Sequence, residues 1–336
     1  MRDIKRKKSV ALTHKSMEYI IQTHHLTKKY GHKIAVNDAN INIRPGEIYG
    51  LIGRNGAGKT TIMRMLSGLS RPTSGSYALF GKEGSALKAE MHNVGVLIEA
   101  PGIYPKMSAY DNLRVKAIAM GKDDKKYIND LLELVDLTDT GKKGAGSFSL
   151  GMRQRLGVAL ALIGDPKLII LDEPINGLDP QGIVEVRQML STLRDERGIT
   201  IMISSHILDE LGKLADSYGI IHEGTLIDEF TNEELQKRSG SYTLLKTDDN
   251  QKALTVIRNM GMQDVSIDAD GILCLRTAPD REHNVVRQLV ESDIFVKEIR
   301  SEKFSLEDYY LEITKEGGEN NNGKSAEDGL LEVKKV

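Results

Sequence analysis

Two kinds of hydrophobic pattern alternate along the first two-thirds of the chain. Short apolar runs, such as 48–53 (IYGLIG), 167–171 (KLIIL) and 200–204 (TIMIS), are separated by segments with apolar residues every three or four positions. Such runs are typical of strands buried on both faces of a parallel sheet, and the wider spacing is typical of amphipathic helices. The pattern predicts an α/β domain over residues 17–238, with a largely parallel sheet.

Within this domain the strand pattern stops at about residue 101 and resumes after about residue 164. Ser108 with Asp111 forms an S-x-x-D signal for the start of a helix. Further on, apolar residues recur at helical spacing at Ile128, Leu131, Leu132 and Val135. The segment 101–164 is therefore predicted to be a helical insert within the α/β domain.

A second, smaller pattern follows a predicted linker at 231–241 (TNEELQKRSGS). The order is strand, helix, two strands, helix and strand, at 241–247, 251–260, 264–268, 272–277, 281–291 and 294–299. The order βαββαβ predicts a small ferredoxin-like α+β domain at 241–315. An amphipathic helix at 305–314 (SLEDYYLEIT) is expected to close it.

The two ends of the chain differ from both domains in composition. Residues 316–336 are polar and rich in Gly and Asn, and they predict a disordered tail. Residues 1–16 are basic and lack the apolar centre of a signal peptide, so they predict a disordered arm. Two alternatives stay open for this arm: Met17 is the natural start, or the basic run 5–8 contacts anionic lipid headgroups.

Composition narrows the classes of function. The 336 residues, 40% of them apolar, are enough for two domains with their own cores. The net charge of −2 gives no overall field that attracts nucleic acid, and no apolar run is long enough to predict a transmembrane helix. Cys274 is the single cysteine, so we expect no structural disulfide and a reducing compartment.

The segment GRNGAGKT at 53–60 fits the pattern G-x-x-x-x-G-K-[ST]. It follows a predicted strand and opens a predicted helix, which is the context in which glycine-rich loops hold phosphate. Lys59 is expected to reach the β- and γ-phosphates, and the Thr60 hydroxyl to bind Mg²⁺. The predicted nucleotide-binding residues of this loop are Gly53, Arg54, Asn55, Gly56, Ala57, Gly58, Lys59, Thr60 and Thr61.

Two carboxylates follow the apolar run at 167–171. A parallel strand presents such residues at its carboxyl end, where open α/β sheets bind ligands. By itself an Asp-Glu pair after a strand indicates a surface turn. With the phosphate loop upstream, we interpret Asp172 as a Mg²⁺ partner and Glu173 as the general base that activates water.

A second helix start that can face an anion lies at 148–155 (FSLGMRQR), where Ser149 and Gly151 precede a helix predicted at 152–163. Exposed N–H groups at a helix start attract anions. An apolar stripe in the same helix indicates core packing as well, at Leu156, Ala159, Leu160 and Ile163. One domain of this size thus carries two segments suited to phosphate.

These motifs, in this order, resemble those of the ATP-binding subunits of ABC transporters, over about Met17 to Phe230. FSLGMRQR resembles the family's signature, usually L-S-G-G-Q, although Leu150 and Met152 depart from it. The resemblance implies a P-loop NTPase domain that pairs head to tail with a second copy. It further implies that Ser149 and Gly151 contact the γ-phosphate of ATP held by the partner, which accounts for two phosphate-facing segments.

The resemblance also assigns four further residues. It implies that Tyr30 stacks on adenine, that Asp179 contacts the partner across the dimer, and that His206 contacts the γ-phosphate. For Tyr30 a core tyrosine at a strand end is the alternative. Glu99 stands where most of the family has a glutamine that senses Mg²⁺ and the attacking water and links them to the membrane subunit. We therefore expect Glu99 to act as a metal ligand and in catalysis.

The function implied by the resemblance is an ATPase, with ATP and Mg²⁺ as cofactors, that drives separate transmembrane permease subunits. A second ATP-binding subunit, in a homodimer, is the other expected partner, and nucleic acid is not. Such a protein works on the inner face of the cell membrane. Glu99 and the segment 305–314 resemble a subgroup that exports bacitracin, lantibiotics and related peptides. The alternatives are an exporter of another substrate and a soluble ATPase of this superfamily that acts in translation or DNA maintenance.

Overall fold

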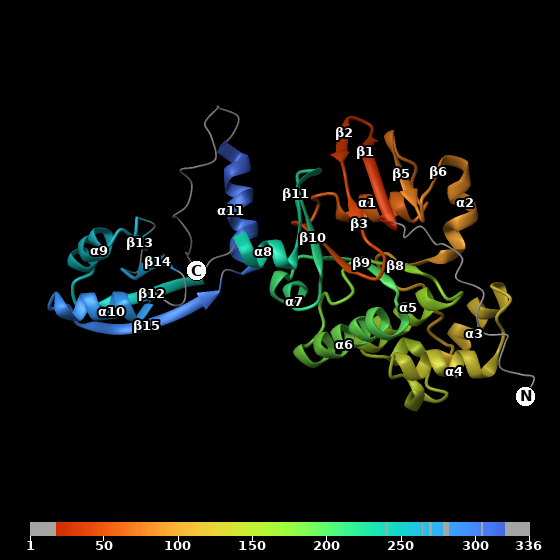
Figure 1. Cartoon of the computed structure of the whole chain (residues 1–336). Coiled ribbons are helices and arrows are strands. Elements are labelled where there is room, and N and C mark those ends of the chain that lie inside the picture. The colour runs from red at the N-terminus through yellow and green to blue at the C-terminus, as the bar shows by residue number, and fades with distance from the viewer. Residues whose placement is uncertain are drawn as a thin grey trace, which may run out of the picture. The chain divides into compact units, whose positions relative to one another are not determined.

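The computed structural model describes residues 18–238, 241–263, 265–268, 271–277, 282–303 and 305–319. These residues form two compact units, drawn in Figure 1. The first comprises the described residues up to His206 together with Leu214–Glu229, and the second comprises Ile207–Lys213 and the described residues from Phe230 onward. The predicted arm at 1–16, and the tail from residue 320, lie outside the described residues.

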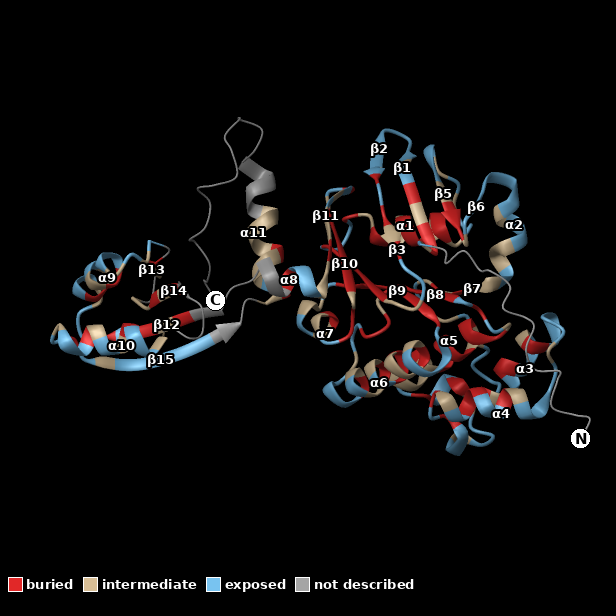
Figure 2. Cartoon of the chain, in the orientation of Figure 1, coloured by how far each residue is buried: buried red, intermediate tan, exposed pale blue. Residues whose placement is uncertain are grey.

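The first unit is built on an 11-stranded sheet whose strands run in the order β6-β5-β1-β2-β11-β10-β4-β9-β8-β7, with β3 paired to β1. The strands from β10 to β7 are parallel to one another. Every residue of β4, β8 and β9 is buried, and Figure 2 shows β8 and β9 in red. The parallel strands and β11 span Ile48–Ile52 (β4), Val94–Leu97 (β7), Leu168–Leu171 (β8), Thr200–Ser205 (β9), Ser217–His222 (β10) and Thr225–Thr231 (β11).

The other half of this sheet is antiparallel, which differs from the largely parallel sheet expected from the sequence. β1 pairs antiparallel with β2, β3 and β5, and β5 with β6. These strands are partly exposed and carry alternating polar residues, so they lack the continuous apolar runs that made the parallel strands recognisable. They span Ile21–Tyr30 (β1), Lys33–Ala39 (β2), Asn42–Ile43 (β3), Ser74–Leu79 (β5) and Lys82–Glu83 (β6).

The predicted helical insert lies between β7 and β8, and no strand interrupts residues 98–167. Ser108 caps α3 by accepting a hydrogen bond from the backbone N–H of Asp111 at 3.1 Å, which confirms the predicted cap. α5 packs against β7 and so joins the insert to the sheet. The helices of this unit span Lys59–Leu66 (α1), Leu87–Glu90 (α2), Ala109–Ala119 (α3), Lys125–Leu134 (α4), Leu150–Leu162 (α5) and Pro180–Arg197 (α6).

The second unit contains a four-stranded antiparallel sheet in the order β13-β14-β12-β15. Its element order is βαββαβ, as the sequence pattern predicts. Apolar residues of two helices and four strands form one core, including Leu245, Ile257, Leu275 and Leu289. The elements span Ser241–Thr247 (β12), Asn250–Asn259 (α9), Val265–Ile267 (β13), Leu273–Thr277 (β14), Glu282–Glu291 (α10) and Val296–Lys303 (β15).

Three further helices complete this unit: Leu208–Gly212 (α7), Asn232–Arg238 (α8) and Leu306–Glu319 (α11). α8 occupies the segment that the sequence predicted to be a linker. The reason is a capping box, in which Thr231 Oγ1 accepts from Glu234 N at 3.1 Å and Glu234 Oε2 accepts from Thr231 N at 2.7 Å. α11 packs against α7 and continues to Glu319, into the first residues of the predicted tail.

Gly95 allows α5 to approach β7 closely. A Cβ atom built on Gly95 would lie 2.2 Å from the carbonyl oxygen of Ala161 in α5. A backbone atom cannot turn aside as a side chain can, so any larger residue must push the strand and the helix apart. Because α5 begins at the signature segment, this contact also fixes where that segment lies on the sheet.

We predict that Gly95→Ala lowers the free energy of unfolding by about 1–3 kcal/mol, the usual cost of overpacking a core contact. Gly102→Ala is the matched control, because a Cβ atom there meets nothing within 4 Å. Urea unfolding of both variants and the parent chain measures the difference. Equal stabilities of the two variants would contradict a tight contact at Gly95.

Candidate nucleotide site

The loop after β4 has a backbone shape that requires glycine. Gly58 lies at φ 115° and Gly56 at φ 83°, both in the left-handed region. A Cβ atom on Gly53 would lie 2.5 Å from the carbonyl oxygen of Ile221, and one on Gly58 would lie 2.6 Å from that of Ala35. The loop is thus held close to the backbone of neighbouring strands, and α1 begins directly behind it.

The other loop residues differ in exposure. Arg54 and Asn55 are exposed, whereas Ala57 is buried and its carbonyl accepts a hydrogen bond from Gly224 N at 2.9 Å. Thr61 lies half-buried in the first turn of α1. The tip of the loop therefore faces solvent while its base is packed on the sheet.

Lys59, the first residue of α1, is only 5% exposed. Its Nζ atom donates a hydrogen bond to the carbonyl oxygen of Gly53 at 2.6 Å and lies 3.1 Å from Glu173 Oε1. A buried ammonium needs such partners, because an isolated charge is costly to remove from water. The lysine therefore closes the loop and connects it to the end of β8.

Asp172 joins three structural elements through its carboxylate. Its Oδ2 accepts from Thr60 Oγ1 at 2.8 Å, and its Oδ1 accepts from Ser204 Oγ at 2.6 Å. Asp172 follows β8, Thr60 lies in α1 and Ser204 lies in β9. Oxygen ligands of this kind suit a hard divalent cation, so the pair Thr60 and Asp172 fits the predicted Mg²⁺ partners.

Glu173 has an unusual backbone conformation, with φ at 50°. Residues other than glycine adopt this region rarely and at an energetic cost, and such residues cluster at functional sites. The backbone N–H donates to Ser204 Oγ at 2.9 Å, and the side-chain Oε2 lies 2.7 Å from His206 Nδ1. One carboxylate oxygen therefore faces the imidazole of His206 and the other the ammonium of Lys59.

Glu99 also has a positive φ, of 64°, and follows β7. Its carboxylate forms an ion pair with Arg64, which lies in α1 one turn beyond Thr60. Both side chains are well exposed, so this pair contributes little to stability, typically below about 1 kcal/mol. It links α1 to the segment that leads from the sheet into the helical insert.

The signature segment forms a second cluster. Ser149 caps α5, its Oγ accepting from Met152 N at 3.2 Å, so the helix starts two residues before the predicted position. A Cβ atom on Gly151 would lie 3.8 Å from Leu178, and one on Gly177 would lie 3.2 Å from Leu150. The start of α5 therefore packs beside residues 176–179 (NGLD), which end at the cap of α6.

Asp179 and Tyr30 lie at the ends of regular elements. Asp179 caps α6, its Oδ1 accepting from Gly182 N at 3.1 Å. Tyr30 ends β1 with 47% of its surface exposed, and Lys28 Nζ lies 5.0 Å from its ring centre. The exposed part of the Tyr30 ring is therefore available for stacking. Among the described contacts, Tyr30 and Glu99 are not joined to either cluster.

A buried hydrogen bond anchors β4 beneath the phosphate loop. The Tyr49 hydroxyl donates to Glu229 Oε1 at 2.9 Å, and Asn42 donates to both oxygens of the same carboxylate. A Cβ atom on Gly219 would lie 2.0 Å from that hydroxyl, so β10 needs glycine where the tyrosine crosses it. Burial raises the pKa of Glu229 and raises the pKa of Tyr49 well above its usual value.

Comparison with known proteins identifies the family to which this chain belongs. The family model described as "ABC transporter" matches residues 36–176. The bacitracin transport ATP-binding protein BcrA of Bacillus licheniformis is 44% identical over 299 residues, which cover 88% of this chain and 98% of that protein. The chain belongs to the ABC transporter family. Its nucleotide site is accordingly that of an ATPase.

Other proteins similar to this chain are also components of ABC transporters. The lantibiotic transport ATP-binding protein SrtF of Streptococcus pyogenes is 47% identical over 208 residues, covering 62% of this chain and 89% of that protein. The structure of cbiO1 from Clostridium perfringens, part of the ABC transporter complex cbiONQ, has a TM-score of 0.61 and 25% identity, covering 73% and 97% of the two chains. No helix in the described ranges is both long and apolar enough to cross a bilayer.

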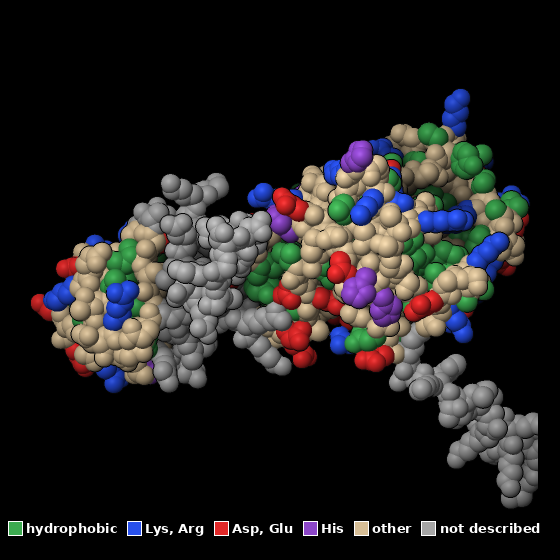
Figure 3. Space-filling model, turned by 90° about the horizontal axis from the view of Figure 1, so that it is seen from above, with side chains coloured by type: hydrophobic (Ala, Val, Ile, Leu, Met, Phe, Trp, Pro, Cys, Tyr) green, Lys and Arg blue, Asp and Glu red, His purple; other side chains and the backbone are tan. Residues whose placement is uncertain are grey.

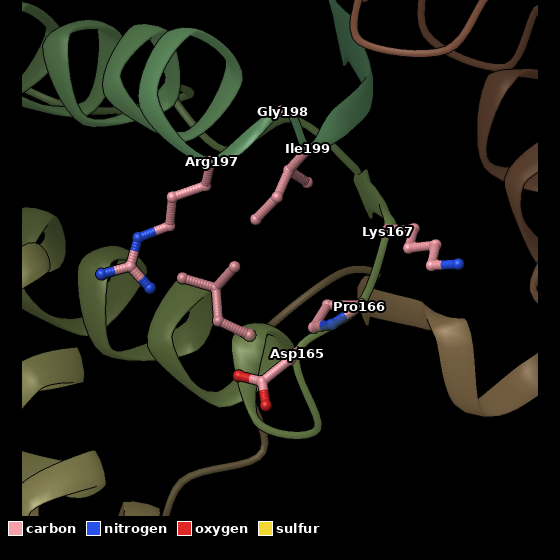
Figure 4. Close-up of a pocket in the computed structure, with 7 residues that line it drawn as sticks. Asp165, Pro166, Lys167, Arg197, Gly198 and Ile199 are labelled. Atoms are coloured by element: carbon pink, nitrogen blue, oxygen red, sulfur yellow. The ribbon is translucent and has the colours of Figure 1, made fainter. Parts of the chain in front are cut away.

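Two hollows lie away from the phosphate loop of this ABC ATPase. One, of about 210 Å³, lies at the amino end of β8, where Figure 4 shows Asp165 and Arg197 at its border and Lys167 pointing away. The other, of about 340 Å³, lies between β7, α3 and α5 and is lined by Leu97, Tyr104 and Lys116, among others. The Lys116 ammonium donates to the carbonyl of Leu160 at 2.7 Å, and burial lowers its pKa.

The sequence analysis missed two residues of the site, Ser204 and Arg64. Ser204 binds both Asp172 Oδ1 and the backbone N–H of Glu173, and it is fully buried. A signal was available, because Ser204 and His206 are two residues apart at a strand end and alternation along a strand turns both to one side. Arg64 gave no comparable signal, because it is an ordinary basic residue in the middle of a helix.

We predict that Ser204→Ala lowers kcat by about 10–100-fold, the usual effect of removing a group that orients a metal ligand or catalytic residue. The variant leaves Asp172 Oδ1 and Glu173 N without a partner, so the free energy of unfolding should also fall by about 1–3 kcal/mol. Ser205→Ala is the control for kcat only, because its side chain leaves the opposite face of β9 but is itself buried and has a partner. Phosphate release and urea unfolding measure both effects. Equal kcat values for the two variants would remove Ser204 from the site.

Proposed function

We propose that this chain binds and hydrolyses ATP to power a separate membrane permease, and that the cargo is a peptide antibiotic of the bacitracin or lantibiotic type. The observation that carries the ATPase part is the convergence of Lys59, Asp172, Glu173 and His206, which come from three segments far apart in the sequence. The relatives named for bacitracin and lantibiotic transport support the cargo.

In this proposal each side chain of the site has a specific role. Glu173 accepts the proton of the attacking water, because its carboxylate is held by His206 on one side and Lys59 on the other. Lys59 exchanges the carbonyl of Gly53 for phosphate oxygens. Thr60 and Asp172 hold Mg²⁺, which neutralises phosphate charge when bound. Tyr30 stacks on adenine, and the amide N–H groups from Gly53 to Thr61 surround the phosphates.

Two copies are needed for a complete site. Ser149 and Gly151 lie at an exposed helix start, and no described contact joins them to the phosphate loop of their own chain. We propose that they face the γ-phosphate of ATP bound by a second copy, with Asp179 beside them at the same interface. This arrangement explains why one chain carries two helix starts suited to phosphate.

The permease is proposed to dock at the hollow between β7, α3 and α5. Its lining includes the exposed apolar side chains of Tyr104 and Val115, and three further apolar side chains of the helical insert are exposed, those of Met107, Ile118 and Met120. Exposed apolar groups around a hollow are typical of protein interfaces. Glu99 lies two residues before Pro101, which lines this hollow, so a change at the nucleotide can reach the docked permease. Docking there would place the chain on the inner face of the membrane.

The soluble alternatives receive less support. Members that act on DNA require a long coiled-coil insert, but α3, α4 and α5 contain only 11, 10 and 13 residues. On the face of the first unit seen in Figure 3, basic and acidic side chains are interspersed, without a basic band suited to nucleic acid. An exporter of another substrate remains the competing hypothesis for the cargo.

We predict that Glu173→Gln retains ATP binding but loses steady ATP turnover by a factor of about 10² or more, because an amide cannot accept the water's proton. Phosphate release and equilibrium nucleotide binding should be measured on the same preparation. The variant should also accumulate an ATP-dependent association of the first units of two copies, which sedimentation detects as a larger mass or, where the copies are already joined elsewhere, as a more compact particle. Turnover close to the parent value would exclude Glu173 as the base.

The control for the dimer is Ser149→Arg in the Glu173→Gln background. A bulky cation at the start of α5 should prevent the partner's ATP from docking, while nucleotide affinity of the single chain stays nearly unchanged. An ATP-dependent change in sedimentation that survives Ser149→Arg would contradict the proposed two-copy site.

For Glu99 we predict an effect on coupling rather than on capture of ATP. Glu99→Ala should leave ATP affinity nearly unchanged, weaken transport per ATP, and alter the dependence of the ATPase rate on Mg²⁺, because a negative charge near the nucleotide is removed. Glu99→Gln should be milder. Arg64→Ala is the matched variant, since it frees the Glu99 carboxylate without removing it. Unchanged coupling and Mg²⁺ dependence in all three variants would make Glu99 a bystander.

A further inference from the structure

Among the residues that the structure describes, the sheet of the second unit ends in one short and one long edge strand, each paired on one side only. β13, at one edge of the sheet, contains only three residues, whereas β15, at the other edge, contains eight (Figure 1). Short edge strands are a common protection against pairing with another chain, and long ones are an opportunity for it. On β15 every residue from 297 to 301 is exposed, including Ile299 at 42%.

The charges along β15 are arranged symmetrically about Ile299. Glu298 and Arg300 flank it and form an ion pair with each other at 3.0 Å. When two copies of such a strand pair antiparallel about residue 299, residue 298 of each copy lies opposite residue 300 of the other, and Ile299 lies opposite itself. Both cross-strand charge pairs are then attractive, and the exposed isoleucines cover one another.

The two neighbouring registers of the same symmetry lack this match. A shift that centres the pairing on residue 298 or 300 sets like charges directly opposite each other, which is unfavourable. A slip by one residue brings opposite faces of the two sheets together. Charged edge strands often serve to prevent pairing. Here the mixed signs disfavour the registers centred on residues 298 and 300, and the register centred on Ile299 combines opposite-charge pairs with the pairing of the two exposed isoleucines.

We propose that the second unit is a dimerisation module in which β15 pairs antiparallel with β15 of a second copy of this chain, centred on Ile299. Such an interface is two-fold symmetric and closes after two copies. The two sheets join into one, with α9 and α10 of both copies on the same face. This interface needs no nucleotide, so it is independent of the proposed ATP-bound contact between the first units.

Cysteine cross-linking of the full chain without nucleotide tests the register, in a Cys274→Ser background. Residues opposite each other in antiparallel strands have Cα atoms about 4.5–5.5 Å apart, which suits a disulfide. Ile299→Cys should therefore form a cross-linked dimer under mild oxidation. Lys297→Cys alone should not, because its copies lie four positions apart, but it should cross-link to Ser301→Cys in a mixture. Equal cross-linking of all single variants would overturn the register.

Charge exchange tests the interface without oxidation. Glu298→Arg should weaken self-association by about tenfold or more, as should Arg300→Glu, because like charges then face each other. An equimolar mixture of the two variants should recover association, since one copy is then basic and the other acidic at both positions. Circular dichroism checks that each variant folds. Variants that remain dimeric alone, or a mixture that remains monomeric, would overturn the proposal.

The proposed function and the proposed β15 interface can be contradicted independently of each other. The cross-linking and charge experiments use no ATP, and Ser149→Arg should leave both results unchanged. Loss of the Ile299 cross-link in an active ATPase would overturn only the β15 interface. Retention of the cross-link in a chain without ATP turnover would leave the β15 interface intact and contradict only the proposed function. A parent chain that binds a different protein at β15 and never self-associates would also overturn the interface.

Discussion

The hydrogen bonds of the Asp172 carboxylate hold the nucleotide site together. This carboxylate is only 6% exposed, and a buried charge of that kind is tolerated when it has good partners. Its two oxygens bind Thr60 in α1 and Ser204 in β9, while its own chain continues β8. Three elements that are adjacent in space but distant in sequence are thereby brought into register. Lys59 and Glu173 then face each other across the same junction.

Backbone strain occurs just beyond the carboxyl ends of two neighbouring parallel strands. Glu173 and Glu99 follow the neighbouring strands β8 and β7, and both have positive φ values. Ser204 Oγ accepts a hydrogen bond from the backbone N–H of Glu173, and the Glu99 carboxylate pairs with Arg64. The cost of such a conformation is about 1–3 kcal/mol for each residue. Rearrangement of either contact on nucleotide binding would release part of that strain, which provides a physical route from the γ-phosphate to the helical insert.

Much of the fold could be read from the sequence because the relevant signals are local. The buried strands, the phosphate loop and the cap at Ser108 follow from short patterns, and all of them are present in the structure. The antiparallel half of the sheet was not foreseen, because strand pairing is decided by partners far along the chain. α8 was assigned to a linker although Thr231 and Glu234 form a capping box, since the polar composition outweighed that signal.

The residues of the site also fall into two groups, those with a local sequence signal and those without one. Motif spacing predicted the residues that are proposed to contact the nucleotide, but Ser204 and Arg64 contact other residues of this region and depend on three-dimensional proximity. The edge of β15 is a further case, because the meaning of Glu298, Ile299 and Arg300 emerges only when the strand is known to have one free side. In the proposed assembly, where the nucleotide sites form between two copies, a permanent contact through β15 would assist their formation. Tethering raises the effective concentration of the partner, commonly to the millimolar range for short flexible linkers. Closure on ATP then becomes an intramolecular step, and its rate no longer depends on how much free protein is present.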